Sequence, residues 1–105
     1  MTTSTSLPQV LKAEVSTRRL VLHLSDGTKA EAPLDLFPVL AAARPEEWAA
    51  WEVIHGGHAV RWPLLDEDIS VFSVLHPDET IPMRPEAVTR RLRNIQRRRA
   101  RDGRR

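Results

Sequence analysis

The chain has 105 residues, which is enough for one compact domain. It contains no cysteine, so disulfides, thiolate metal sites and cysteine nucleophiles are excluded. Its apolar runs are short and no charged segment precedes an apolar stretch at the N-terminus, so we expect neither a membrane span nor a secretory signal and assign the protein to the cytoplasm.

Charge is unevenly distributed along the chain, although the formal net charge is only +2. Residues 1–83 hold six basic and twelve acidic residues, a net charge of −6. Residues 84–105 hold ten arginines and two acids, a net charge of +8. The sequence therefore predicts an acidic body followed by a cationic C-terminal arm.

The N-terminal half of the body favours strands. Residues 1–9 show no periodicity and are expected to form a disordered lead-in. Aliphatic residues dominate 10–15 and 20–24, and a polar connection separates them, so these segments predict a β-hairpin. The Asp26-Gly27 pair predicts a tight turn, because glycine tolerates a positive φ, and a third antiparallel strand is expected over 29–32.

Short helices and a second hairpin are expected next. Apolar residues over 36–40 share one helical face, with Asp35 as the expected N-cap. A second helical turn is expected to begin at Pro45, which two acids follow. The segments 52–55 and 59–62 flank Gly56-Gly57 and predict the second hairpin.

Three consecutive acids, Asp66, Glu67 and Asp68, precede the apolar residues of 69–75. Acidic side chains stabilise the first turn of a helix, so this run predicts a helix start. The carboxylates could also bind magnesium, but adjacent side chains diverge, so capping is the favoured interpretation. These elements predict an α+β fold, with a small antiparallel sheet of two hairpins covered by short helices.

The C-terminal arm predicts a further helix. A domain over 10–76 is followed by a proline-containing linker over 77–85 and by the arm over 86–105. Within the arm, Val88, Leu92 and Ile95 recur at helical spacing and form a narrow apolar stripe among the arginines of a helix over 86–100. Asp102-Gly103 is expected to end this helix.

Several motifs of the body resemble the domain of unknown function 2442 (DUF2442) family. They comprise Leu24-Ser25-Asp26-Gly27, Leu36-Phe37-Pro38, the run from Gly56 to Pro63 that ends in Trp-Pro, and Leu65-Asp66-Glu67-Asp68-Ile69-Ser70-Val71. The resemblance covers about 10–75 and implies a small bacterial or phage α+β protein. It assigns no catalytic residues and implies a protein partner, as in toxin–antitoxin pairs. The arm lies outside it.

Arginine dominates the arm, and its planar fork matches phosphate geometry, so the primary hypothesis is contact with nucleic-acid phosphates. No aromatic residue follows Phe72, so bases have no stacking platform and binding should show little sequence specificity. The predicted nucleic-acid-binding residues of the arm are Arg84, Arg90, Arg91, Arg93, Arg97, Arg98, Arg99 and Arg101.

Two other anionic partners remain open. The apolar stripe of Val88, Leu92 and Ile95 could dock on an acidic protein surface, which would make the chain an antitoxin-like or oligomerising interaction module. The arm could also dock on the chain's own acidic body or on a second copy, or it could be a solvated tail without a partner.

Nothing in the sequence predicts catalysis. There is no Gly-x-Ser-x-Gly elbow and no phosphate-binding glycine loop, so we expect no enzyme activity and no cofactor. His55 and His58 bracket a Gly-Gly turn, but two histidines are weak support for zinc, and no metal site is predicted. The tryptophans are expected to form core rather than a ligand pocket.

Overall fold

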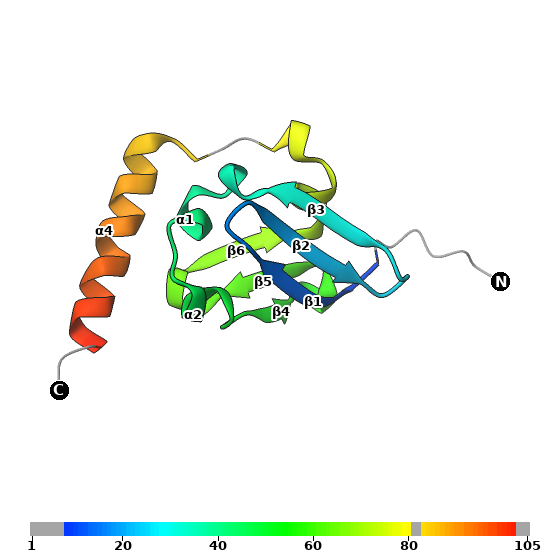
Figure 1. Cartoon of the computed structure of the whole chain (residues 1–105), viewed down its shortest axis with the longest axis horizontal. Coiled ribbons are helices and arrows are strands. Elements are labelled where there is room, and N and C mark those ends of the chain that lie inside the picture. Colours follow the sequence, from blue (N-terminus) through cyan, green and yellow to red (C-terminus); the bar gives the residue numbers. More distant parts are fainter. Residues whose placement is uncertain (1–7, 81–82, 103–105) are drawn as a thin grey trace.

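The computed structural model describes residues 8–80 and 83–102, and it confirms the α+β class. Six strands form two three-stranded antiparallel sheets with the orders β1-β2-β3 and β4-β5-β6 (Figure 1). The strands of the first sheet are β1 (Val10–Val15), β2 (Arg19–Leu24) and β3 (Lys29–Pro33). Those of the second sheet are β4 (Glu52–Ile54), β5 (Ala59–Trp62) and β6 (Glu67–Ser70).

Short helices connect and cover the sheets. The α-helices of the body are α1 (Pro38–Ala41), α2 (Pro45–Trp48) and α3 (Val71–Leu75). Four 3₁₀ turns are η1 (Leu34–Leu36), η2 (His55–Gly57), η3 (Pro63–Leu65) and η4 (Pro77–Glu79). The arm forms α4 (Pro85–Asp102), which lies along one end of the body in Figure 1. No described helix is both long and apolar enough to span a membrane.

The predicted strands and turns of the first sheet are confirmed. On β2, Leu20, Leu22 and Leu24 are buried while the residues between them are more exposed, as expected for a strand with one face on the core. Gly27 has a φ of 88°, which explains the Asp-Gly turn between β2 and β3. The segments 1–7 and 81–82 and the end of the arm from Gly103 lie outside the described residues, and so do the predictions made on them.

Two helix starts were predicted wrongly. Asp35 lies inside η1 and caps no helix, and α1 begins only at Pro38. The run from Asp66 does not begin a helix either, since Glu67–Ser70 pair with β5 as the strand β6. The N-cap of α3 is Ser70, whose hydroxyl accepts a hydrogen bond from the Ser73 N–H at 3.1 Å.

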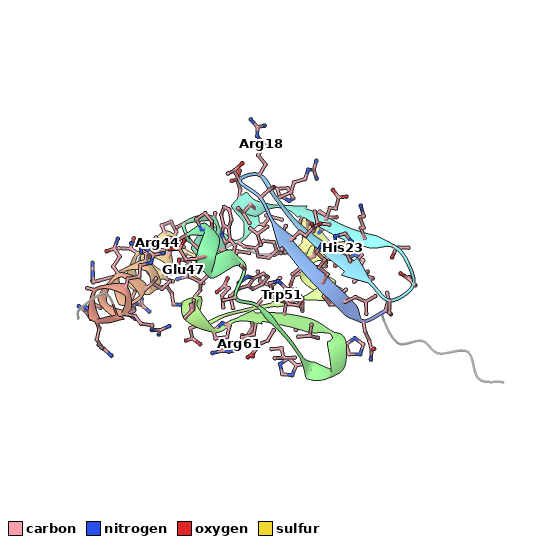
Figure 2. All side chains as sticks on the ribbon, turned by 60° about the horizontal axis from the view of Figure 1, so that its bottom comes forward. Arg18, His23, Arg44, Glu47, Trp51 and Arg61 are labelled. Carbon is pink, nitrogen blue, oxygen red and sulfur yellow. The ribbon has the colours of Figure 1, made fainter. Side chains whose placement is uncertain are left out.

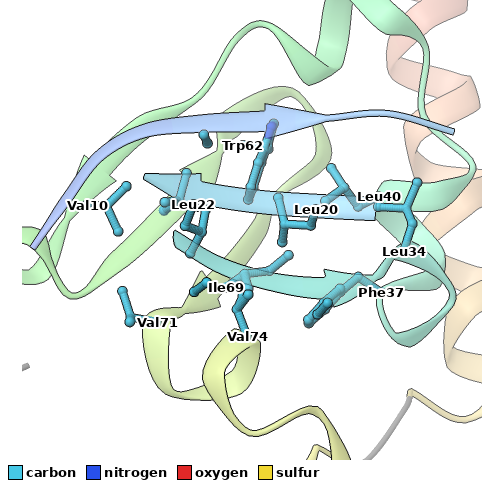
Figure 3. Close-up of a cluster of buried hydrophobic side chains, with 14 of the residues drawn as sticks. Val10, Leu20, Leu22, Leu34, Phe37, Leu40, Trp62, Ile69, Val71 and Val74 are labelled. Atoms are coloured by element: carbon cyan, nitrogen blue, oxygen red, sulfur yellow. The ribbon is translucent and has the colours of Figure 1, made fainter. Parts of the chain in front are cut away.

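One hydrophobic core joins both sheets, α1, α3 and the arm (Figure 3). Trp62 is fully buried at its centre, and its indole N–H donates to the Trp48 carbonyl at 3.0 Å. The Trp48 indole donates in turn to the Leu40 carbonyl at 2.7 Å. Trp62 thus forms part of the core, as predicted, whereas Trp48 and Trp51 are only partly buried and pack against it.

Candidate functional site

Helix α4 carries all the arginines predicted to bind nucleic acid except Arg84, which directly precedes it. Pro85 opens the helix, where its missing N–H costs nothing, and Glu86 in the first turn complements the helix dipole. Arg99 and Arg101 complement the dipole at the other end.

The apolar stripe of α4 packs on the chain's own body. Ile95 is 3% exposed and belongs to the main core, and Leu92 packs against that core while remaining half-buried. Val88 is half-buried as well. The face that we assigned to a partner protein is therefore largely occupied within the chain, so a partner could use it only by displacing the body.

Arg99 forms a buried ion pair with the body. Its Nε donates to Glu47 Oε2 at 2.9 Å and its Nη2 to Glu47 Oε1 at 2.5 Å. Glu47 is only 5% exposed, and its Oε1 also accepts from the N–H of Arg44, the N-cap residue of α2, at 2.8 Å. The hydrogen bonds from Arg99 hold the pKa of Glu47 below its usual value despite burial. Figure 2 shows Arg44 and Glu47 beside α4.

Arg91 and Arg98 bind the carbonyls of the turn that follows β5. The turn η3 ends at Asp66 in a left-handed conformation, with a φ of 53°, and the Pro63 carbonyl accepts a hydrogen bond from the Asp66 N–H at 3.2 Å. The carbonyls of Leu64, Leu65 and Asp66 accept from side chains of α4. Arg98 donates to the Leu64 carbonyl at 3.0 Å, and Arg91 donates to the Leu65 carbonyl at 2.9 Å and to that of Asp66. The two arginines therefore cap this turn.

Arg91 also meets a buried carboxylate. Its Nη2 lies 3.1 Å from Glu67 Oε1, on the buried face of β6. Burial raises the pKa of Glu67 above its usual value, and Arg91 opposes that shift only in part. Glu67 and Glu47 thus both pair with α4, but their pKa values shift in opposite directions.

The arginines of the arm that the structure describes fall into two sets. Arg91, Arg98 and Arg99 hold the body and are half-buried. Arg84, Arg90, Arg93, Arg97 and Arg101 are exposed, and none of them makes a side-chain hydrogen bond or ion pair with another described residue. Sequence periodicity could have separated the sets, because every inward arginine is three or four residues from Ile95 and so lies on its helical face.

The acidic run of β6 serves the body. Arg61 on β5 donates to Asp66 Oδ1 at 2.9 Å and to Asp68 Oδ1 at 2.6 Å. These hydrogen bonds lower the pKa of Asp66. Among residues 8–80 and 83–102, no group of three His, Cys, Asp or Glu side chains could hold a metal ion, and this includes His55, His58 and the acidic run.

Comparisons with known proteins identify a family and a fold. The family described as "Protein of unknown function (DUF2442)" matches residues 10–80, which leaves α4 outside the match. No curated protein matches. A crystal structure of a protein of unknown function from Rhodospirillum rubrum is similar, with a TM-score of 0.60 and 24% sequence identity over 79% of this chain and 99% of that one. At this identity the similarity establishes the fold alone.

Proposed function

The chain belongs to the DUF2442 family, whose description names no activity, and we propose that it is a non-enzymatic accessory or regulatory protein that binds nucleic-acid phosphates through the outer face of α4. In this proposal the body holds α4 in a fixed position and orientation. We place this activity in the bacterial cytoplasm, the setting that the family resemblance suggests.

The observation that carries the proposal is a row of exposed arginines that form no ion pair with any other residue that the structure describes. Arg90, Arg93, Arg97 and Arg101 follow one another at steps of three or four residues, so they share one face of α4, and all four are exposed. The row extends over roughly 16 Å at 1.5 Å per residue. Figure 2 shows nitrogen-tipped side chains projecting from α4 into solvent.

Such a row is unfavourable for the isolated protein. Like charges three or four residues apart destabilise a helix by a few tenths of a kcal/mol per pair. In the arm, each arginine of the row has another as such a neighbour. A phosphate between two guanidinium groups would relieve this repulsion and accept hydrogen bonds from both, which supports an anionic ligand with regularly spaced charges.

A salt titration tests the proposal. If the four arginines of the row neutralise four phosphates of duplex DNA, the logarithm of affinity should fall with the logarithm of salt concentration at a slope of about −3 to −4. The double variant R93A/R97A should bind the duplex more weakly, and its slope should be less negative than that of the parent by about 2. Fluorescence anisotropy of a labelled 20-base-pair duplex measures both quantities.

The control is R18A/K29A, which removes two exposed charges from the body. Arg18 lies in the turn between β1 and β2 and projects away from α4 in Figure 2. This variant should keep the affinity and the salt slope of the parent protein. Equal losses in R93A/R97A and R18A/K29A would contradict the proposal, as would the absence of any salt-dependent binding.

A second candidate function is docking on an acidic protein. It has one specific support, because Arg91 and Arg99 already contact carboxylates of the body, the same groups that an acidic partner would offer. A partner of this kind would have to displace the body from α4. Partner binding should then make the arm more sensitive to trypsin, whereas phosphate binding on the outer face should protect it.

A further inference from the structure

We infer that α4 is a recognition helix that enters the major groove of duplex DNA and reads base edges there. This inference rests on the proposed function and goes beyond it, because phosphate binding alone carries no sequence selectivity. It departs from our sequence-based expectation that binding shows little sequence specificity. The reason is the set of α4 side chains that remain exposed when the helix packs on the body.

Rotation of α4 about its axis is fixed by contacts along its length. Arg91 binds the end of η3, Ile95 lies in the core, and Arg99 pairs with Glu47. These contacts span residues 91–99, which is about two helical turns. A helix held this way presents the same outer face in every molecule, which is the preorganisation that specific recognition requires.

The outer face is arranged symmetrically about Ile95. At about 100° per residue, Arg93 and Arg97 each lie roughly 160° from Ile95 and about 40° from each other, so both point away from the body on the same face of the helix. Asn94 and Gln96 lie about 100° from it, one on each flank. All four are exposed.

These residue types match base edges in the major groove. An arginine fork donates to O6 and N7 of guanine, and the amide of Asn or Gln pairs with N6 and N7 of adenine. Thr89 and Ala100 also lie on the exposed part of α4, and both residue types make apolar contact with the thymine methyl group. Asn94 and Gln96 carry no charge, so on the flanks of the arginines they can add hydrogen bonds to base edges without adding to the sequence-independent attraction between charges.

Duplex DNA fits this helix better than RNA or a single strand. A helix about 10–12 Å wide enters a major groove about 12 Å wide, whereas the major groove of A-form RNA is too narrow for side chains to read. No aromatic residue follows Phe72, so α4 offers no stacking surface for unpaired bases. In Figure 1 the body covers α4 from one side, which leaves the opposite side open to a duplex.

The size of the outer face predicts the size of the site. The segment from Arg90 to Arg101 rises about 16 Å, which corresponds to roughly five base pairs at 3.4 Å each. Arg93 and Arg97 would read the central pairs, and Arg90 and Arg101, nearer the ends, would contact flanking phosphates. A single copy should therefore select a motif of about four to six base pairs that contains guanine.

The experiment is selection of duplexes by the full-length protein from a pool of randomised 20-base-pair DNA, at a salt concentration of about 100 mM. We expect a short enriched motif. Replacing its purines with 7-deaza analogues, which lack the N7 acceptor of the major groove, should lower affinity between about fivefold and a hundredfold. Replacing guanine with inosine, which removes only the minor-groove amine, should change affinity less than about twofold.

Two variants separate base reading from charge. R93K/R97K keeps the charges but removes both guanidinium forks, and N94A/Q96A leaves every charge in place. Each should reduce the preference for the selected duplex over a scrambled one by about fivefold or more, with the salt slope unchanged. The matched control R90K/R101K alters the ends of the row and should leave the preference unchanged.

The outcomes distinguish the inference from the proposal beneath it. Salt-dependent binding without an enriched motif, without an effect of 7-deaza purines, or with a preference for RNA would overturn the inference and leave phosphate binding standing. No binding to any nucleic acid would overturn both. A motif whose recognition is lost in N94A/Q96A but retained in R90K/R101K would establish base reading by α4.

Discussion

Replacing Arg99 with Met tests whether the arm is part of the folded body. Methionine retains much of the aliphatic length of the side chain but removes the guanidinium group. Glu47 Oε2 then loses its donor from Arg99, and Oε1 keeps only the Arg44 N–H. Since Glu47 is 5% exposed, its carboxylate would remain buried without a cation.

Removing one partner of a buried ion pair lowers the free energy of unfolding by about 3 to 5 kcal/mol, because the other charge stays buried without a counter-charge. The cost here should be lower, because a cavity of roughly 300 Å³ lined by Glu47, Ile95 and Arg98 could admit water beside the carboxylate. We therefore expect R99M to lose about 2 to 3 kcal/mol at pH 7. With a urea m-value of about 1 to 1.5 kcal/mol/M, the unfolding midpoint should fall by about 2 M.

The pH dependence gives the prediction its sign. In the parent protein the pKa of Glu47 is lowered, so this group contributes stability above its unfolded pKa of about 4.3 and loses it as pH falls through the lower folded value. In R99M, burial acts on Glu47 without Arg99 and should raise that pKa. Acid then stabilises the variant relative to the parent, and the difference should shrink by about half between pH 7 and pH 4.5.

Urea titrations followed by tryptophan fluorescence at both pH values provide the measurement. R97M, an exposed change on the same helix, should cost less than about 0.5 kcal/mol. E47Q/R99M should recover at least half of the loss, because the amide that replaces the Glu47 carboxylate buries no charge. Equal midpoints for R99M and R97M, or a difference independent of pH, would refute the reasoning.

Other predictions concern the turns and the core. Gly57 has a φ of 97°, and a Cβ at this position would lie 2.7 Å from Gln9 Cβ, whereas Gly56 has a φ of 64° and no atom within 4 Å of such a Cβ. Urea unfolding should therefore show a loss in the free energy of unfolding of more than about 2 kcal/mol for G57A and of about 1 kcal/mol for G56A. Because Ile95 is buried, I95A should lower the free energy of unfolding by about 2 to 4 kcal/mol and make trypsin cleave the arm faster. Equal cleavage rates for the parent and the variant would contradict the packing of α4 on the body. Burial raises the pKa of Glu67 in the folded state above its value in the unfolded chain. The free energy of unfolding should therefore fall as pH rises from the unfolded pKa through the folded one. E67Q should remove this decline, and at pH 7 its free energy of unfolding should differ from that of the parent by less than about 1 kcal/mol. Urea unfolding midpoints measured across this pH range test both expectations.

The sequence was most informative where a local pattern had one physical meaning. The alternation of Leu20, Leu22 and Leu24 predicted a strand, and Asp26-Gly27 predicted its turn, because these signals depend only on side-chain period and backbone freedom. The acidic run from Asp66 was misread, since acids favour helix starts but also pair across strands. The contacts of Asp66 and Asp68 with Arg61 depend on the pairing of β6 with β5, and no local pattern in the sequence reveals that pairing.

By itself the sequence determined that an acidic body precedes a basic helix with a narrow apolar stripe, because charge and periodicity are properties of the chain alone. Periodicity places three arginines on the face of Ile95, but only the tertiary structure decided that this face packs on the body and which groups the three arginines contact. Arg91, Arg98 and Arg99 turn inward because the packing of Ile95 places them beside Glu67, the carbonyls of η3 and Glu47. These partners lie 24 to 52 residues away in sequence, so their contact with the arm is a consequence of the fold.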